Sequence, residues 1–180
     1  MNFKFILTLL MSMCAIVKPY SYVKELDLVK YQGTWYEVYD DIFDETFQKG
    51  GTCVTANYKL NSEGTIDVLN REVSKNNKIE NITGKAYYDK GNSGGELTVD
   101  LNGAPYPAPY WVVELGPIVD NLYDYSIVSD NHQISLFVLT RHIDRFFKLY
   151  DQKVLNSIND MGFTKFFDKP KLVNQTDCPF

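Results

Sequence analysis

The sequence predicts an all-β domain followed by one helix. Turn-forming clusters recur along the middle of the chain at nearly even spacing, and the segments between them alternate apolar and polar residues. After the last of these segments the apolar period changes to that of a helix. Short strands at this spacing are typical of an antiparallel barrel or sandwich. No repeat, low-complexity run or linker divides the chain, so we expect a single domain.

The amino terminus has the pattern of a targeting segment. Lys4 precedes an apolar core at residues 5–17. A bilayer-spanning helix needs about 20 apolar residues, so this core is too short to span a membrane. A short basic region followed by such a core is typical of a cleaved secretory signal.

The cleavage point has two candidates. We assign residues 1–21 to the signal peptide and 22–180 to the domain, with cleavage after Ser21 or, alternatively, after Ala15. A lipid-modified Cys14 is the competing interpretation. It is disfavoured because Met13 stands where a lipoprotein signal carries a small residue.

The negative net charge restricts which binding partners are expected. The full chain has a formal charge of −5, and removal of Lys4 and Lys18 without any acidic residue brings it to −7. A chain this acidic is expected to have no basic patch for nucleic acid or an anionic membrane. No second apolar segment of spanning length follows the signal, so we expect a soluble, secreted protein.

The predicted strands are separated by Gly, Asn, Asp and Pro clusters. Alternation is clearest in the second strand, where Val54, Ala56 and Tyr58 share a face. The strands are expected at about 34–40, 52–60, 65–73, 78–88, 96–101, 108–115, 122–129 and 132–140.

A helix is predicted from about 145 to 160, with Asp144 as its N-cap and Gly162 as its stop. Phenylalanines at 163, 166 and 167 then predict a short ninth strand. The apolar stripe that would pack on the outside of the β domain consists of Phe147, Tyr150, Val154, Leu155 and Ile158.

Two cysteines remain after the signal segment. In an oxidising compartment an isolated pair predicts one disulfide, between Cys53 and Cys178. Asn81 and Asn174 begin glycosylation sequons, so each is a candidate glycan acceptor in a eukaryotic source.

Several motifs occur in a recognisable order. Gly33-Thr34-Trp35-Tyr36 opens the first strand, Tyr123-Asp124-Tyr125 follows a turn, and Val138-Leu139-Thr140-Arg141 ends the last strand. With Cys53 and the Asp177-Cys178-Pro179 ending, they resemble lipocalins of the group typified by apolipoprotein D, insect bilin-binding proteins and bacterial lipocalins. The resemblance implies an eight-stranded antiparallel up-and-down barrel with the C-terminal helix packed outside. Such a barrel can hold one small ligand.

The resemblance assigns Gly33, Trp35 and Arg141 to closure of one end of the barrel. An indole fills that end, and a guanidinium can lie over its face while donating to nearby carbonyls. These three residues are therefore expected to hold the fold and not to contact the ligand.

Binding residues are expected on the inner wall, where apolar and aromatic side chains carry a few polar groups. Phe137 is the strongest candidate, because relatives place a cavity aromatic four residues before the closing Arg. A register error of one residue would turn any of the others outward. The remaining candidates are Tyr39, Tyr58, Tyr110, Val112, Tyr125 and Leu139.

The predicted function is carriage of a small hydrophobic ligand: a fatty acid or lipid, a retinoid or sterol-like molecule, or a bilin. We expect no enzyme activity and no cofactor, because no catalytic or cofactor motif is recognised. Neither His132 nor His142 has a Cys, Asp or Glu at the sequence spacing of metal ligands, so no metal site is expected. The chain is expected to be a monomer or a weak homo-oligomer.

Two alternatives stay open. One is a lipocalin enzyme acting on its bound lipid, for which Glu37 and Glu114 are the only conceivable pocket carboxylates. The other is a protein- or membrane-interaction module whose barrel is filled by its own side chains.

The acidic loop after the first strand is expected to be solvated or to repel anions at the mouth of the barrel. It contains Asp40, Asp41, Asp44 and Glu45.

Overall fold

The computed structural model describes residues 20–41 and 50–180. Most of the predicted signal segment, including Cys14, lies outside these residues, as do Asp44 and Glu45 of the acidic loop. The account below concerns the described residues.

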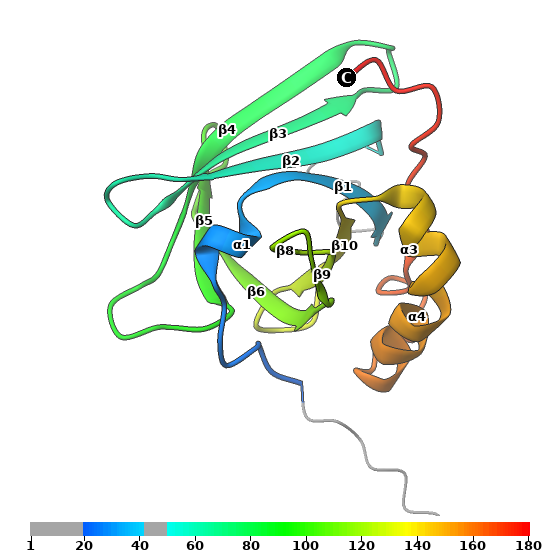
Figure 1. Ribbon diagram of the computed structural model, residues 1–180. Helices are drawn as coiled ribbons and strands as arrows, with labels where there is room; N and C mark the ends of the chain where they lie inside the picture. The colour runs from blue at the N-terminus through cyan, green and yellow to red at the C-terminus, as the bar shows by residue number, and fades with distance from the viewer. Residues whose placement is uncertain (1–19, 42–49) are drawn as a thin grey trace, which may run out of the picture.

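Eight antiparallel strands form a closed barrel, as predicted. Each strand pairs with its neighbours in turn, and β10 returns to pair with β1, which closes the ring. Figure 1 shows the ring of strands with two helices on one side. The barrel strands are β1 (Gly33–Asp40), β2 (Thr52–Leu60), β3 (Ile66–Val73), β4 (Ile79–Tyr87), β5 (Glu96–Leu101), β6 (Ala108–Leu115), β9 (Tyr125–Ser129) and β10 (Leu136–Thr140).

Two predicted strands are shorter than expected. The segment 122–129 is divided at Asp124, whose backbone N–H donates to the Pro117 carbonyl. This division leaves a small hairpin of β7 (Ile118–Val119) and β8 (Leu122–Tyr123) before β9. β10 begins only at Leu136, because residues 130–135 form a turn. The carboxylate of Asp130 holds that turn by accepting from three backbone N–H groups.

The predicted helix is present but bent. It consists of α3 (Ile143–Leu149) and α4 (Asp151–Asp160), joined at Tyr150 through a hydrogen-bond ladder that continues across the bend. His142, and not Asp144, occupies the N-cap, and it makes no side-chain capping bond. The buried stripe starts at Phe146 instead of Phe147. The predicted stop is confirmed, since Gly162 follows the C-cap with φ +98°.

The predicted ninth strand at residues 163–167 is wrong. That segment is a turn, and the short ninth strand of the sheet is β11 (Lys171–Leu172), which pairs with the end of β1. A further element, α1 (Leu28–Tyr31), escaped prediction because it has only one turn. Its N-cap is Asp27, whose carboxylate accepts from the N–H groups of Val29 and Lys30.

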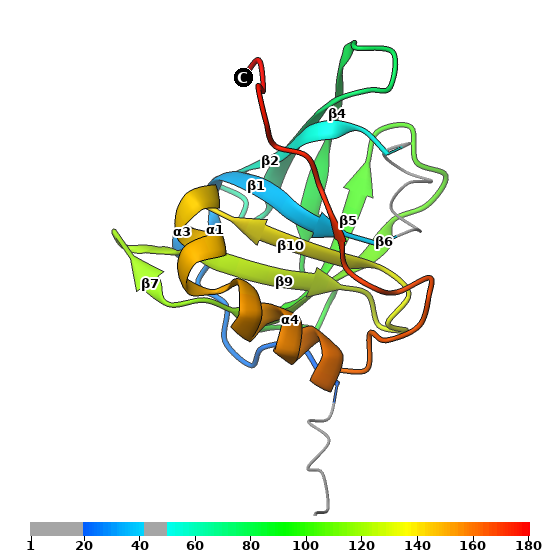
Figure 2. The same ribbon diagram turned by 90° about the vertical axis from the view of Figure 1, so that its right-hand side faces the viewer.

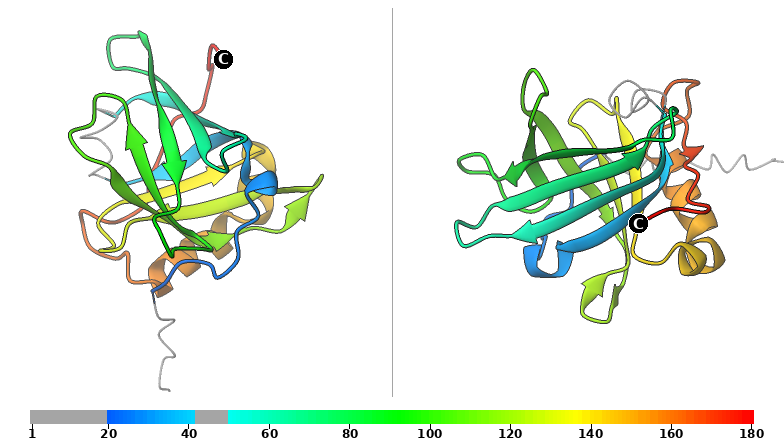
Figure 3. Two further views of the ribbon diagram at one scale, coloured as in Figure 1. Left: turned by 90° about the vertical axis from the view of Figure 1, so that its left-hand side faces the viewer. Right: turned by 90° about the horizontal axis from the view of Figure 1, so that it is seen from above.

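The up-and-down topology gives the barrel two distinct ends. At the end where β1 begins, α1 and the turn after Thr140 come together, and we call this the closed end. The opposite, open end carries the turns at 74–78, 102–107 and 130–135. Figure 3 shows that the helices lie on one side of the barrel while β4 and β5 lie on the other.

Candidate functional site

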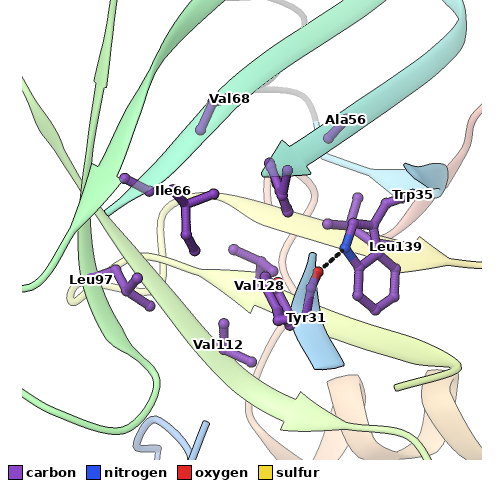
Figure 4. Packing of buried hydrophobic residues seen from close by; sticks show 11 residues of the cluster. Tyr31, Trp35, Ala56, Ile66, Val68, Leu97, Val112, Val128 and Leu139 are labelled. Carbon is purple, nitrogen blue, oxygen red and sulfur yellow. Dashed lines mark hydrogen bonds between the residues drawn. The ribbon is translucent and has the colours of Figure 1, made fainter. Parts of the chain in front are cut away.

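The barrel wall separates two apolar clusters. One lies inside the barrel, where side chains from most strands point toward one another (Figure 4). The other lies between the outer face of the wall and the helices. The inner cluster contains Tyr31, Trp35, Ala56, Tyr58, Ile66, Val68, Ala86, Leu97, Val112, Val128 and Leu139.

The closed end is built on Trp35 and Arg141. The guanidinium carbon of Arg141 lies 3.5 Å from the centroid of the Trp35 ring, within cation–π range. Its nitrogens donate to the carbonyls of Thr34 at 2.6 Å, Gln32 at 2.8 Å and Tyr31 at 3.0 Å. Trp35 Nε1 donates to the Tyr31 carbonyl at 2.8 Å, as Figure 4 shows. This guanidinium is therefore engaged with the backbone and the indole.

Gly33 fits against the same guanidinium. It has φ +98°, a conformation that favours glycine, and an added Cβ would lie 3.2 Å from Arg141 Nη1. A larger residue at this position would be strained and would press on Arg141. This geometry accounts for the Gly-x-Trp pattern at the start of β1.

Three phenol hydroxyls form a chain inside the barrel. Tyr110 Oη lies 2.8 Å from Tyr31 Oη and 3.1 Å from Tyr58 Oη. Tyr31 Oη also lies 3.1 Å from Ser126 Oγ. Burial raises the pKa of Tyr31 to about 12 and raises those of Tyr58 and Tyr110 as well, so all three stay protonated at neutral pH. They can orient a polar group by hydrogen bonding without adding charge.

Five of the predicted binding residues belong to the interior. Tyr58, Val112 and Leu139 are buried in the inner cluster, while Tyr110 and Phe137 pack against it and are only partly buried. Phe137 lies beside Val128 in the register of β9 and β10, toward the open end. The structure thus brings these side chains from three strands, β2, β6 and β10, together on one inner wall.

Tyr39 and Tyr125 face outward, which corrects their expected position. The pairing of β1 with β10 slips by one residue between Glu37 and Tyr39, so the alternation that begins at Trp35 is inverted beyond this bulge. Tyr39 instead donates to Asp151 Oδ1 of α4 at 2.7 Å. Tyr125 also lies in the outer cluster, where it packs against Phe146.

The two candidate carboxylates lie on opposite sides of the wall. Glu114 follows a bulge in β6 and faces the helices, where it accepts from Tyr125 Oη at 3.0 Å and from Ser157 Oγ. Glu37 is 3% exposed and precedes the bulge in β1, on the same face as Trp35. Its charge contributes to the raised pKa of Tyr58. Glu37 is therefore the only one of this pair that an interior ligand could approach.

Sequence reasoning missed several inward residues. Val99 and Leu101 of β5 pack against the inner cluster and stay partly exposed. Asn70 shares the inward face of β3 with Ile66 and Val68, and its Oδ1 is buried without a hydrogen-bond partner among the described residues. The alternation of inward and outward side chains along β3 and β5 could have identified all three residues from the sequence.

Other candidate chemistry is sparse in the described part of the chain. It contains no group of three or more His, Cys, Asp or Glu side chains that could hold a metal ion. His132 and His142 are both exposed. Asp40 and Asp41 are buried, and burial raises the pKa of Asp40 to about 6. These two carboxylates of the acidic loop are therefore not solvated, contrary to expectation.

No helix among the described residues is long and apolar enough to cross a membrane. The predicted disulfide is confirmed, since Cys53 and Cys178 are bonded across a sequence separation of 125 residues. Such bonds persist in oxidising, extracytoplasmic compartments.

A closed antiparallel barrel with an apolar interior, one closed end and an external helix defines a class of small-ligand-binding proteins. A family model described as "Lipocalin-like domain" matches residues 26–171. The chain therefore belongs to the lipocalin family, which confirms the resemblance in its motifs.

Its relatives come from distant organisms. It is 33% identical over 158 residues to the outer membrane lipoprotein Blc of Vibrio cholerae, covering 87% of this chain and 84% of that protein. It is 31% identical over 164 residues to apolipoprotein D of Cavia porcellus, covering 87% and 80%. Insecticyanin from the tobacco hornworm Manduca sexta shares the fold, with a TM-score of 0.64 at 17% identity, covering 89% of this chain and 86% of that one.

Proposed function

We propose that the protein carries a small hydrophobic ligand inside its barrel, outside the cytoplasm. The observation that supports this most directly is the incomplete burial of inward-facing apolar side chains. Val99, Leu101, Tyr110 and Phe137 pack against the inner cluster yet remain partly exposed, whereas Tyr31 and Trp35 at the closed end are buried. A ligand entering through the open end would cover these surfaces.

Binding would be an equilibrium transfer from water to a preformed apolar wall. Each Å² of apolar surface removed from water contributes about 25 cal/mol. The hydroxyl chain of Tyr31, Tyr110 and Tyr58, together with the Asn70 amide, would orient the ligand's polar group. Fatty acids or lipids, retinoid or sterol-like molecules and bilins are the candidate classes. We retain Tyr58, Tyr110, Val112, Phe137 and Leu139 as proposed contacts.

The predicted signal peptide and the disulfide both support a location outside the cytoplasm. We propose that the chain is secreted after removal of its amino-terminal segment, in keeping with the oxidised Cys53–Cys178 pair. Asn81 and Asn174 are both exposed, as glycan acceptors must be.

A native mass spectrum of the secreted protein, paired with its ultraviolet–visible absorption, tests this proposal. We expect a mass excess that disappears on denaturation, and its value would identify the ligand. An empty barrel that also takes up no added fatty acid, retinoid or bilin would overturn the carrier function. It would favour instead a barrel filled by its own side chains.

A matched pair of phenylalanines locates the binding site. Phe137→Ala removes an inner-wall ring and should weaken ligand binding about ten-fold, the equivalent of roughly 1.4 kcal/mol of lost apolar contact. Phe147→Ala removes a ring of α3 that is 40% exposed on the outside, and it should leave affinity unchanged. Equal affinities in both variants, measured by fluorescence titration with circular dichroism as the folding check, would argue against an interior site.

A further inference from the structure

The segment that joins α4 to β11 exposes an unusual amount of apolar surface. Phe166 is 85% exposed, and Leu172 is 61% exposed a few residues later. Phe167 lies between them in the sequence and is 39% exposed. Exposed aromatic side chains that gather in one place mark an interaction surface. We call residues 165–172 the aromatic turn.

A buried carboxylate shapes the aromatic turn. Asp168 is 3% exposed and accepts a hydrogen bond from the backbone N–H of Lys165 at 2.5 Å. The N–H groups of Asp168 and Lys169 return bonds to the Lys165 carbonyl at 3.2 and 3.1 Å. This bonding holds the backbone of a turn whose tip carries Phe166 and Phe167. The exposure of Phe166 is thus a feature of an ordered turn.

The charge of the aromatic turn is opposite to that of the whole protein. Lys165, Lys169 and Lys171 are exposed, and Lys165 Nζ lies 5.4 Å from the centroid of the Phe167 ring. Asp168 is the only acidic residue from 162 to 174, and its side chain is buried. The negative net charge predicts no basic patch on this protein. The aromatic turn is nevertheless a local basic surface.

The aromatic turn lies toward the open end of the barrel. Gln133, in the turn between β9 and β10, donates to the carbonyl of Met161 at the end of α4. β11 pairs with the end of β1 that is remote from Gly33. Figure 2 shows the segment after α4 beside the hairpin of β9 and β10. Other hairpins of the same end expose Ile79, Tyr106 and Ile134.

We propose that the aromatic turn docks the protein on an anionic phospholipid surface, with the open end of the barrel facing the bilayer. Phenylalanine side chains would enter the boundary between headgroups and acyl chains, while the lysines would contact anionic headgroups. A protein partner fits less well, because lysine is depleted in the cores of protein interfaces. This proposal does not depend on the barrel holding a ligand.

Vesicle co-sedimentation tests the proposal. The full chain is expressed with Cys14→Ser, so that lipid modification cannot cause membrane binding, and mixed with phosphatidylcholine vesicles that contain or lack phosphatidylglycerol. We expect binding to the anionic vesicles and weaker binding to the neutral ones. Phe166→Ser/Phe167→Ser should weaken binding about ten-fold, since two ring contacts are lost. Lys165→Gln/Lys169→Gln should weaken binding only to the anionic vesicles.

Matched variants on other surfaces serve as controls. Ile118→Ser/Leu149→Ser removes two hydrophobic side chains that are 54% and 59% exposed away from the open end, and Lys90→Gln/Lys148→Gln removes two exposed lysines. Neither pair should change binding. Absence of binding to both vesicles, or equal effects of control and test variants, would overturn the proposal. Equal binding to anionic and neutral vesicles would overturn its electrostatic part.

Discussion

At the scale of single residues, Arg141 shows why a charged side chain sits at the end of an apolar barrel. Its planar guanidinium covers the Trp35 ring and donates to three carbonyls within 3.0 Å. Burial lowers the pKa of Arg141 to about 10, which still leaves it protonated at neutral pH. A lysine would keep the charge but could not make the same fork of bonds.

We therefore expect Arg141→Lys to lower the free energy of unfolding by about 2–4 kcal/mol, because carbonyls lose donors and the indole loses its cover. Urea denaturation measures this loss. Arg71→Lys is the matched control, since Arg71 is exposed and lies 6.0 Å from the Phe180 ring, and it should change stability by less than about 0.5 kcal/mol. Similar values for both variants would mean that Arg141 does not close the barrel.

The titration of Asp40 makes the stability of the folded protein depend on pH. Burial raises the pKa of Asp40 to about 6 despite the opposing charge of Lys171, so the folded protein binds this proton more tightly than the unfolded chain does. The associated stability is fully present below about pH 4 and is lost as the pH rises through about 6.

Asp40→Asn should consequently stabilise the protein near neutral pH by up to about 2 kcal/mol and have little effect near pH 4. Urea unfolding of both proteins across this range measures the difference. A stability difference between Asp40→Asn and the parent that is constant with pH would contradict the role of Asp40 titration.

At the scale of elements, the turns were more predictable than the faces of the strands. Gly, Asn and Asp clusters located every barrel strand, because turn chemistry is local. Tyr39 was placed on the wrong face because the bulge after Glu37 has no local signature. Tyr125 was misplaced because both faces of β9 are apolar, one packing in the barrel and the other under α3.

The segment before α1 behaves as part of the domain. The ring of Tyr20 lies 5.9 Å from that of Trp111 and 6.2 Å from that of Phe163, and its hydroxyl donates to the Asp130 carbonyl. Burial raises the pKa of Tyr20 to about 12. The Val23 N–H then donates to the Val112 carbonyl of β6, and the Val23 carbonyl accepts from the N–H of Gly95, just before β5. Cleavage after Ser21 would remove Tyr20 from this packing.

We accordingly predict that the mature chain retains Tyr20, with cleavage after Ala15. The intact mass of the secreted protein decides between the two sites. A chain that begins at Tyr22 should be less stable by about 2 kcal/mol, because the Tyr20 ring no longer fills its place against Trp111 and Phe163. A mature mass that begins at Tyr22, with the stability of the longer chain, would refute this prediction.

At the scale of the whole molecule, the carboxyl-terminal segment joins parts of the chain that are distant in sequence. Cys53 is bonded to Cys178, and the Cys53 N–H also donates to the Asn174 carbonyl at 2.8 Å. Gln175 Nε2 donates to the carbonyls of Glu37 and Val54, each at 2.8 Å. The sequence predicted the covalent bond from two cysteines alone, but the side-chain amide that bridges β1 and β2 has no pattern that reveals it.

The disulfide acts on the unfolded chain more than on the barrel, because the hydrogen bonds of Gln175 and Asn174 can hold the folded segment without it. Closing so long a loop removes conformational entropy from the unfolded state, which the chain-entropy model values at about 4–5 kcal/mol. Cys53→Ser/Cys178→Ser should lower the free energy of unfolding by about this amount while leaving the circular dichroism of the folded state unchanged. The parent protein under reducing conditions is the control and should match the variant. If the variant lost less than about 1 kcal/mol, the unfolded chain would have to remain compact without the bond, and the stabilisation would not be entropic.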